Sequence, residues 1–127
     1  MSEKQLTILI IDDVPLNVAL LEMILQQAGY RTLSAFSGME GRQLALQDKP
    51  SLILLDVMMP MEDGVMTCRI LKADPRTTDI PVIFVSALDG VADRTSGFIA
   101  GVVDYITKPL KKTEVLEKIA LHLRISE

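Results

Sequence analysis

The chain has 127 residues, with 13 Lys and Arg against 17 Asp and Glu, a formal net charge of −4, and 49% apolar residues. This length is typical of one domain whose core buries about two-thirds of the unfolded surface, and the composition excludes a disordered chain. The acidic balance argues against an electrostatic grip on nucleic acid, whose phosphates are bound by Lys and Arg. We therefore expect residues 1–127 to form a single globular domain without direct nucleic-acid binding.

The cysteine content and the N-terminus indicate the compartment. Cys68 is the only cysteine, which excludes an internal disulfide and fits a reducing environment. No apolar run approaches the roughly 20 residues of a membrane span, and residues 1–5 lack the apolar region of a secretory signal. We expect a cytoplasmic protein that does not bind membranes.

Five short apolar runs predict β-strands. They lie at residues 6–11, 31–36, 52–55, 81–85 and 102–106. The first, third and fourth runs are almost unbroken Ile, Leu and Val, the pattern of strands that are covered on both faces. The second run alternates apolar and polar residues, as expected of an edge strand.

Amphipathic segments between and after these strands predict five helices. They lie at residues 16–28, 38–47, 65–73, 89–100 and 113–125. Gly29 is a natural stop for the first helix, and Thr113 is the expected N-cap of the last. Five strand–helix units predict a parallel sheet with helices on both faces. The fold class is therefore α/β: a doubly wound, flavodoxin-like three-layer (βα)5 sandwich with strand order 2-1-3-4-5.

Polar residues gather where the predicted strands end. Asp12 and Asp13 follow the first strand, Asp56 the third and Ser86 the fourth, while the fifth leads to Lys108. Each alone is an ordinary cap, turn or solvated residue. Together they meet at one sheet edge, where clustered carboxylates stay ionised only beside a cation. Oxygen ligands with room for water suit Mg²⁺, and Mg²⁺ with a lysine and a hydroxyl suits a phosphoryl group, which a carboxylate can accept.

Five separate segments then make a specific match. They read IIDD at residues 10–13, LLDVMMP at 54–60, Gly64, VSA at 85–87 and DYITKP at 104–109. In their order and spacing the chain resembles the response-regulator receiver domains of two-component signal transduction, the CheY-like superfamily, from about residue 6 to residue 123.

The resemblance implies a metal-assisted phosphoacceptor site. Asp56 is then the phosphoacceptor, Asp13 a direct Mg²⁺ ligand, and Asp12 a ligand acting through water. Asp56 and the backbone carbonyl of Met58 complete the protein ligands, and Mn²⁺ is a candidate substitute for Mg²⁺.

The resemblance also assigns the groups that respond to phosphorylation. Lys108 contacts the phosphoryl oxygens, Ser86 hydrogen-bonds one of them, and Tyr105 is the aromatic side chain that turns inward when Ser86 moves. The Lys108–Pro109 peptide bond is expected to be cis.

The implied function is that of a phosphoprotein switch in a two-component phosphorelay, not of a turnover enzyme. A sensor histidine kinase or a histidine phosphotransfer protein donates the phosphoryl group, and the acyl phosphate is slowly hydrolysed in place. Phosphorylation then alters the face made by the fourth helix, fifth strand and fifth helix, which signals to an effector protein or output domain. A phosphorylation-dependent homodimer through this face is a further expectation.

Two other functions remain to be weighed. A small Mg²⁺-dependent phosphohydrolase with Asp56 as nucleophile would need an acid two residues later, where Met58 stands. A binding domain whose pocket holds Mg²⁺ only for stability would not need Lys108 and Ser86.

Some residues carry no expected chemistry. Glu62 stands where receiver domains often have Met, which leaves the packing of that loop open. Four methionines crowd residues 58–66, and we interpret them as adaptable core filler because no Cys or His joins them. Cys68 is expected to be a small buried apolar residue, and His122 a surface residue.

Overall fold

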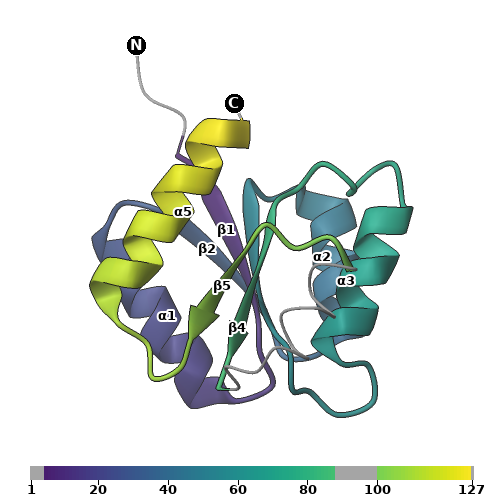
Figure 1. The fold of residues 1–127 in the computed structure, drawn as a ribbon, viewed down its shortest axis with the longest axis horizontal. Coiled ribbons are helices and arrows are strands. Elements are labelled where there is room, and N and C mark those ends of the chain that lie inside the picture. Colours follow the sequence, from purple (N-terminus) through teal and green to yellow (C-terminus); the bar gives the residue numbers. More distant parts are fainter. Residues whose placement is uncertain (1–4, 88–99, 127) are drawn as a thin grey trace.

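Residues 5–87 and 100–126 are described by the computed structural model, and they form a parallel sheet between two layers of helices (Figure 1). The strands and helices are β1 (Thr7–Ile11), α1 (Pro15–Gln27), β2 (Arg31–Ala35), α2 (Gly38–Asp48), β3 (Leu52–Asp56), α3 (Gly64–Ala73), β4 (Val82–Ser86), β5 (Asp104–Thr107) and α5 (Lys112–Ser126). The predicted helix at residues 89–100 lies outside the described residues, apart from Ala100.

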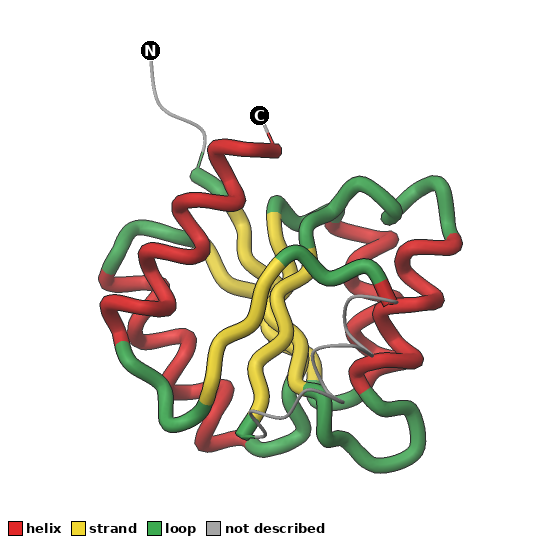
Figure 2. Tube along the Cα trace, in the orientation of Figure 1, coloured by secondary structure: helices red, strands yellow, loops and turns green. Residues whose placement is uncertain are grey.

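The sheet has the strand order β2-β1-β3-β4-β5, with every neighbouring pair parallel. The predicted fold class and strand order are therefore confirmed, with β2 at an edge. Helices α1 and α5 cover one face of the sheet, while α2 and α3 cover the other (Figures 1 and 2). The strand register pairs Asp56 with Val85 and Ser86 with Thr107. The polar carboxyl ends of β3, β4 and β5 therefore lie side by side along one edge of the sheet, the carboxyl edge.

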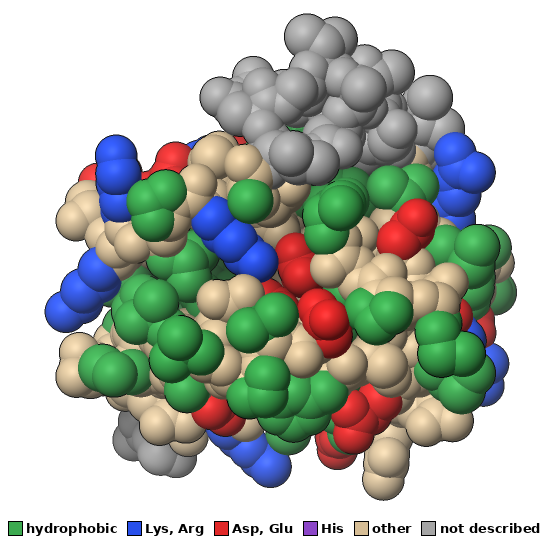
Figure 3. All heavy atoms as spheres, turned by 90° about the horizontal axis from the view of Figure 1, so that it is seen from below, with side chains coloured by type: hydrophobic (Ala, Val, Ile, Leu, Met, Phe, Trp, Pro, Cys, Tyr) green, Lys and Arg blue, Asp and Glu red, His purple; other side chains and the backbone are tan. Residues whose placement is uncertain are grey.

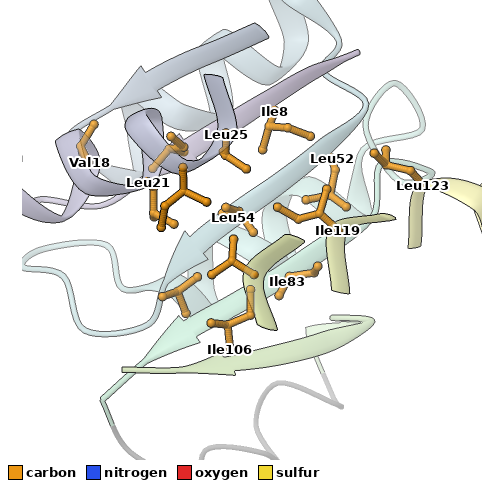
Figure 4. Close-up of a cluster of buried hydrophobic side chains, with 14 residues drawn as sticks. Ile8, Val18, Leu21, Leu25, Leu52, Leu54, Ile83, Ile106, Ile119 and Leu123 are labelled. Atoms are coloured by element: carbon orange, nitrogen blue, oxygen red, sulfur yellow. The ribbon is translucent and has the colours of Figure 1, made fainter. Parts of the chain in front are cut away.

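Each sheet face has its own apolar core. Strand residues alternate between the two cores because successive side chains point to opposite faces. Ile8, Leu54 and Ile83 pack beneath α1 and α5 (Figure 4), while Leu55 and Phe84 pack beneath α2 and α3. This two-sided burial explains why β1, β3 and β4 are apolar except at one end of each strand, where Thr7, Asp56 and Ser86 lie.

The ends of the described helices differ from the prediction by at most one residue, and one cap is wrong. Helix α5 begins at Lys112, so Thr113 lies inside its first turn and is not the N-cap. Gly29 has a φ of +95° directly after the C-cap of α1, as expected of a helix stop. No helix among residues 5–87 and 100–126 is long and apolar enough to cross a membrane.

Gly64 fixes how closely α3 approaches the end of β3. A Cβ on Gly64 would lie 2.3 Å from the carbonyl oxygen of Asp56 and 2.8 Å from the Cα of Val57. Both neighbours are backbone atoms, so a rotamer change relieves neither contact. Only glycine allows α3 to begin against the carboxyl end of the central strand.

We expect Gly64→Ala to lower the free energy of unfolding by about 3 kcal/mol, because the backbone around Asp56 must shift. Gly29→Asn is the matched control: no atom lies within 4 Å of a Cβ there, and asparagine tolerates a positive φ. Urea denaturation of both variants measures the difference. Equal losses in the two variants would contradict the close-approach explanation.

Candidate functional site

Three carboxylates meet at the carboxyl edge of the sheet. Asp12 and Asp13 follow β1 and Asp56 ends β3, and one ligand oxygen from each lies within 4.8 Å of the others. Asp12 and Asp56 are only 2% and 5% exposed. The sheet places them together because β1 and β3 are neighbours, with Ile11 paired to Leu55. Seen from this edge, red carboxylates lie near the centre with a blue basic side chain beside them (Figure 3).

Lys108 provides the positive charge of the site. Its Nζ lies 3.4 Å from Oδ1 of Asp56 and 3.5 Å from Oδ2 of Asp12. The Lys108–Pro109 peptide bond is cis, the isomer that the sequence predicted. The backbone N–H of Lys108 donates to the carbonyl of Ser86 at 2.8 Å, which joins the ends of β4 and β5.

The environment of Asp56 opposes its ionisation. Burial, and next the charge of Asp12, raise the pKa of Asp56 to about 6, although Lys108 and the backbone N–H of Met58 act in the opposite direction. A carboxyl with this pKa is mostly ionised at pH 7. Asp56 is therefore a charged carboxylate held in a position that penalises its charge.

The carboxylates have the unsatisfied oxygens expected of a cation site. Oδ2 of Asp12 and Oδ1 of Asp13 are buried and accept no hydrogen bond from any described residue. Nζ of Lys108 forms an ion pair with Oδ2 of Asp12, but the distance of 3.5 Å is long for a hydrogen bond. Oδ1 of Asp12 accepts from the backbone N–H of Val14 at 2.9 Å, which fixes that side chain. Buried unpaired oxygens are costly, and an oxygen-only set suits a hard divalent cation. The residues present therefore fit Mg²⁺.

Ser86 and Tyr105 lie on the two strands next to the carboxylates. Ser86 ends β4 and is 4% exposed, while the following Ala87 is exposed. The half-buried Tyr105 ring packs edge-on against Phe84, with centroids 6.0 Å apart. The structure thus brings Ser86 to the sheet edge with Asp56, and it places Tyr105 one strand further along.

The loop between β3 and α3 differs from expectation. Of its methionines only Met59 is buried, whereas Met58 and Met61 are 63% and 103% exposed, and Met66 on α3 is 51% exposed. The core-filler interpretation is therefore wrong for three of the four: the loop directs Met58 and Met61 outward, and Met66 lies on the exposed side of α3. Glu62, whose packing was open, forms a two-pronged ion pair with Arg42 of α2.

The isolated cysteine and histidine have structural partners. Cys68 is fully buried, as predicted; its Sγ lies 3.3 Å from the carbonyl of Ala100, and burial raises the pKa of its thiol to about 11. His122, expected at the surface, is partly buried: its Nε2 lies 2.8 Å from Oδ2 of Asp104, and its side chain is 12% exposed. Burial alone would raise the pKa of Asp104, but hydrogen bonds from His122 and the Tyr105 backbone lower it overall.

Sequence comparisons agree with this geometry. The response regulator receiver domain family matches residues 8–120. The chain is 44% identical to the DNA-binding dual master transcriptional regulator RpaA of Synechocystis sp., over 92% of this chain and 48% of RpaA. It is 43% identical to response regulator PleD of Caulobacter vibrioides, over 88% of this chain and 25% of PleD. The chain thus spans half or less of the length of these two relatives, but 93% of protein PilH of Pseudomonas aeruginosa, at 38% identity.

Solved structures show the same fold. A putative response regulator from Chloroflexus aurantiacus superposes with a TM-score of 0.91 at 31% identity, over 95% of this chain and 99% of that chain. The receiver domain of a Pseudomonas aeruginosa sensor histidine kinase, described with a magnesium ion coordinated in its active-site cleft, has a TM-score of 0.88 at 28% identity, over 94% of this chain and 98% of that chain. The fold and the acidic edge define a CheY-like signalling domain. The chain belongs to the response regulator receiver domain family.

We expect Asp56→Asn to raise the free energy of unfolding by about 1–3 kcal/mol at pH 7.5 in the presence of a chelator. The pKa of Asp56 is about 6 in the folded protein and about 3.9 in an unfolded chain. As the pH rises from 4 to 7, the unfolded chain therefore loses this proton first, and the wild type loses stability that the variant keeps.

Urea denaturation of both proteins at pH 4, 5.5 and 7.5 measures this effect. The stability difference should be near zero at pH 4 and complete by pH 7.5. A difference that does not change with pH would show that Asp56 is not penalised by its surroundings.

Proposed function

We propose that this receiver domain, residues 1–127, accepts a phosphoryl group on Asp56 from a phosphohistidine in a partner protein and acts in the cytoplasm as a phosphorylation-controlled switch. The observation that carries the proposal is the meeting of Asp56 with Asp12, Asp13 and Lys108 at the carboxyl ends of the strands. The partner is a sensor histidine kinase or a histidine phosphotransfer protein. A downstream effector or output domain then reads the state of the switch.

The transfer is a displacement at phosphorus. An oxygen of ionised Asp56 forms the new P–O bond while the P–N bond to the partner's imidazole breaks, and the electron pair stays on the imidazole nitrogen. Lys108, 3.4 Å from Asp56, stabilises the charge on the phosphoryl oxygens, and Ser86 supplies a hydroxyl donor at the same edge. Positioning and electrostatics account for the reaction, so the domain needs no separate acid or base.

The metal expected at this site is Mg²⁺, with Mn²⁺ as a substitute. Asp12, Asp13 and Asp56 would hold it together with the backbone carbonyl of Met58. When bound, the cation supplies positive charge to the phosphoryl oxygens and relieves the repulsion among the carboxylates. The buried, unpaired oxygens of Asp12 and Asp13 support this assignment.

The acyl phosphate is proposed to change the face made by the predicted fourth helix, β5 and α5. Phosphorylation adds about −1.5 to −2 charge units beside Lys108 and Ser86. Movement of Ser86 toward the phosphoryl group would change the space available to Tyr105, which now packs against Phe84. Slow hydrolysis by water resets the switch, and a phosphorylation-dependent homodimer through this face is part of the proposal.

The partner surface proposed for phosphoryl transfer is the start of α1. Val14, Leu16 and Leu20 are 42%, 77% and 40% exposed, and this segment follows Asp12 and Asp13 directly. Apolar side chains lie on both sides of the carboxylates in Figure 3. A protein that presents a phosphohistidine to Asp56 must approach this edge, where it covers these side chains.

We expect one phosphoryl adduct per chain when the protein is incubated with Mg²⁺ and acetyl phosphate and weighed intact. Asp56→Asn should abolish the adduct, and so should a chelator, since the carboxylates then repel the phosphoryl oxygens. Asp63→Asn, an exposed residue that caps α3, is the control that keeps the adduct. No adduct with any small phosphodonor would refute the proposal, and rapid multiple turnover of a phosphoester would favour the phosphohydrolase.

We expect Leu16→Asp to slow phosphoryl transfer from a histidine kinase about tenfold, because the charge disrupts the apolar contact. Labelling by acetyl phosphate, which needs no protein contact, should be unchanged. Ile70→Asp, 39% exposed on α3 across the sheet, is the matched control. Equal transfer rates for the two variants, measured with a kinase that phosphorylates the wild type, would place the contact elsewhere.

A further inference from the structure

The loop from Val57 to Asp63 connects the phosphoacceptor strand to α3 and carries Met58. Its two ends are fixed locally: the N–H of Gly64 donates to the carbonyl of Val57 at 2.9 Å, and Oδ1 of Asp63 accepts from the N–H of Met66 at 2.8 Å. The position of the Met58 carbonyl then depends on what holds the middle of the loop.

Glu62 joins this loop to both helices on its side of the sheet. Nε and Nη2 of Arg42 on α2 donate to its two oxygens at 2.9 and 2.8 Å. Oγ1 of the fully buried Thr67 on α3 donates to the same carboxylate at 2.6 Å. The ion pair is largely shielded, with the Arg42 and Glu62 side chains 24% and 15% exposed. A two-pronged, charge-assisted pair of this kind is among the strongest and most directional side-chain contacts.

Gly38, the first residue of α2, packs directly on this group. A Cβ on Gly38 would lie 2.2 Å from Oγ1 of Thr67 and 2.6 Å from Oε2 of Glu62. Helix α2 therefore reaches the loop only because its first residue has no side chain. The contact makes the placement of Glu62 depend on α2 as well as on α3.

The residue before Glu62 has a backbone conformation that its own side chain does not hold. Met61 has a φ of 68°, in the left-handed region that is unfavourable for residues other than glycine, and its side chain is fully exposed. Such a conformation persists when neighbouring residues impose it. Glu62, the next residue, is held by Arg42 and Thr67 through the hydrogen bonds described above.

We infer that Arg42, Glu62 and Thr67 form a positioning network that holds the loop in the conformation which directs the Met58 carbonyl to the cation site. The inference deepens the proposed function and rests on it for the cation. Glu62 stands where receiver domains often have Met, so the network belongs to this sequence's own version of the loop. Arg42, on a helix that contributes no carboxylate to the site, thereby sets the affinity of the site for a divalent cation.

The experiment measures Mn²⁺ binding to the folded protein by calorimetry and by electron paramagnetic resonance. We expect Arg42→Gln and the nearly isosteric Glu62→Gln to weaken binding about 10-fold each, as loss of partners behind a metal ligand does. The double variant should be no weaker than the weaker single variant, because either change breaks the same pair. Arg76→Gln removes the exposed ion pair with Asp74 and should leave binding unchanged.

A second readout separates positioning from general stability. In the metal-free protein, Gly38→Ala and Glu62→Gln should shift the amide resonances of residues 57–62 and increase their hydrogen exchange. A purely structural role would instead lower the unfolding free energy and leave the Mn²⁺ affinity of the folded protein at the wild-type value, which would overturn the inference. Failure of the wild type to bind Mn²⁺ or Mg²⁺ would overturn the proposed function itself, and the two failures are thus distinguishable.

Discussion

Repulsion among carboxylates that the fold forces together is the constraint on which the rest of the site depends. Asp12 and Asp56 are almost completely buried, and Lys108 is the cation beside them among residues 5–87 and 100–126. Neither carboxylate can move away, because Asp12 directly follows β1 and Asp56 is the last residue of β3, and these two strands are paired in the sheet. The apolar cores on the two faces of the sheet offset this local cost, and the edge remains charged and incompletely paired.

A site of this kind responds strongly to added charge of either sign. A cation lowers the repulsion and satisfies the unpaired oxygens of Asp12 and Asp13. The proposed phosphoryl group would add negative charge, and among residues 5–87 and 100–126 Lys108 is the basic side chain beside the carboxylates that would balance it, together with a bound cation. In the proposed switch, the energetic difference between the two states would therefore arise at this buried and incompletely compensated cluster of charges.

The sequence predicted the architecture and the site because both depend on short-range patterns. Unbroken apolar runs identified the central strands, and a parallel sheet brings the carboxyl ends of its strands together. The sequence therefore predicted that Asp12, Asp13, Asp56 and Lys108 lie close to one another. Glu62 and Arg42 are 20 residues apart, and their meeting depends on which way α2 faces the loop. Glu62 is a carboxylate at a position where receiver domains often have Met. This departure was the signal in the sequence that a basic side chain, here Arg42, would pair with it.

Side-chain direction was the other limit. Apolar character alone did not reveal that Met58, Met61 and Met66 are exposed, because composition does not indicate on which side of a loop or helix a residue lies. His122 likewise pairs with Asp104 across the boundary between α5 and β5, which depends on how α5 docks on the sheet. The N-cap of α5 was misplaced by two residues because a lysine begins the helix before the threonine.

The hydrogen bond from the Lys108 backbone to the Ser86 carbonyl has a mechanical consequence. It ties the ends of two parallel strands at the point where one supplies the ammonium of the site and the other its hydroxyl. The position of the Lys108 ammonium and that of the Ser86 hydroxyl are therefore coupled through this backbone hydrogen bond. A substitution that shifts β5 relative to β4 will therefore strain this hydrogen bond and change the distance between Lys108 and Ser86, even when it lies far from either side chain.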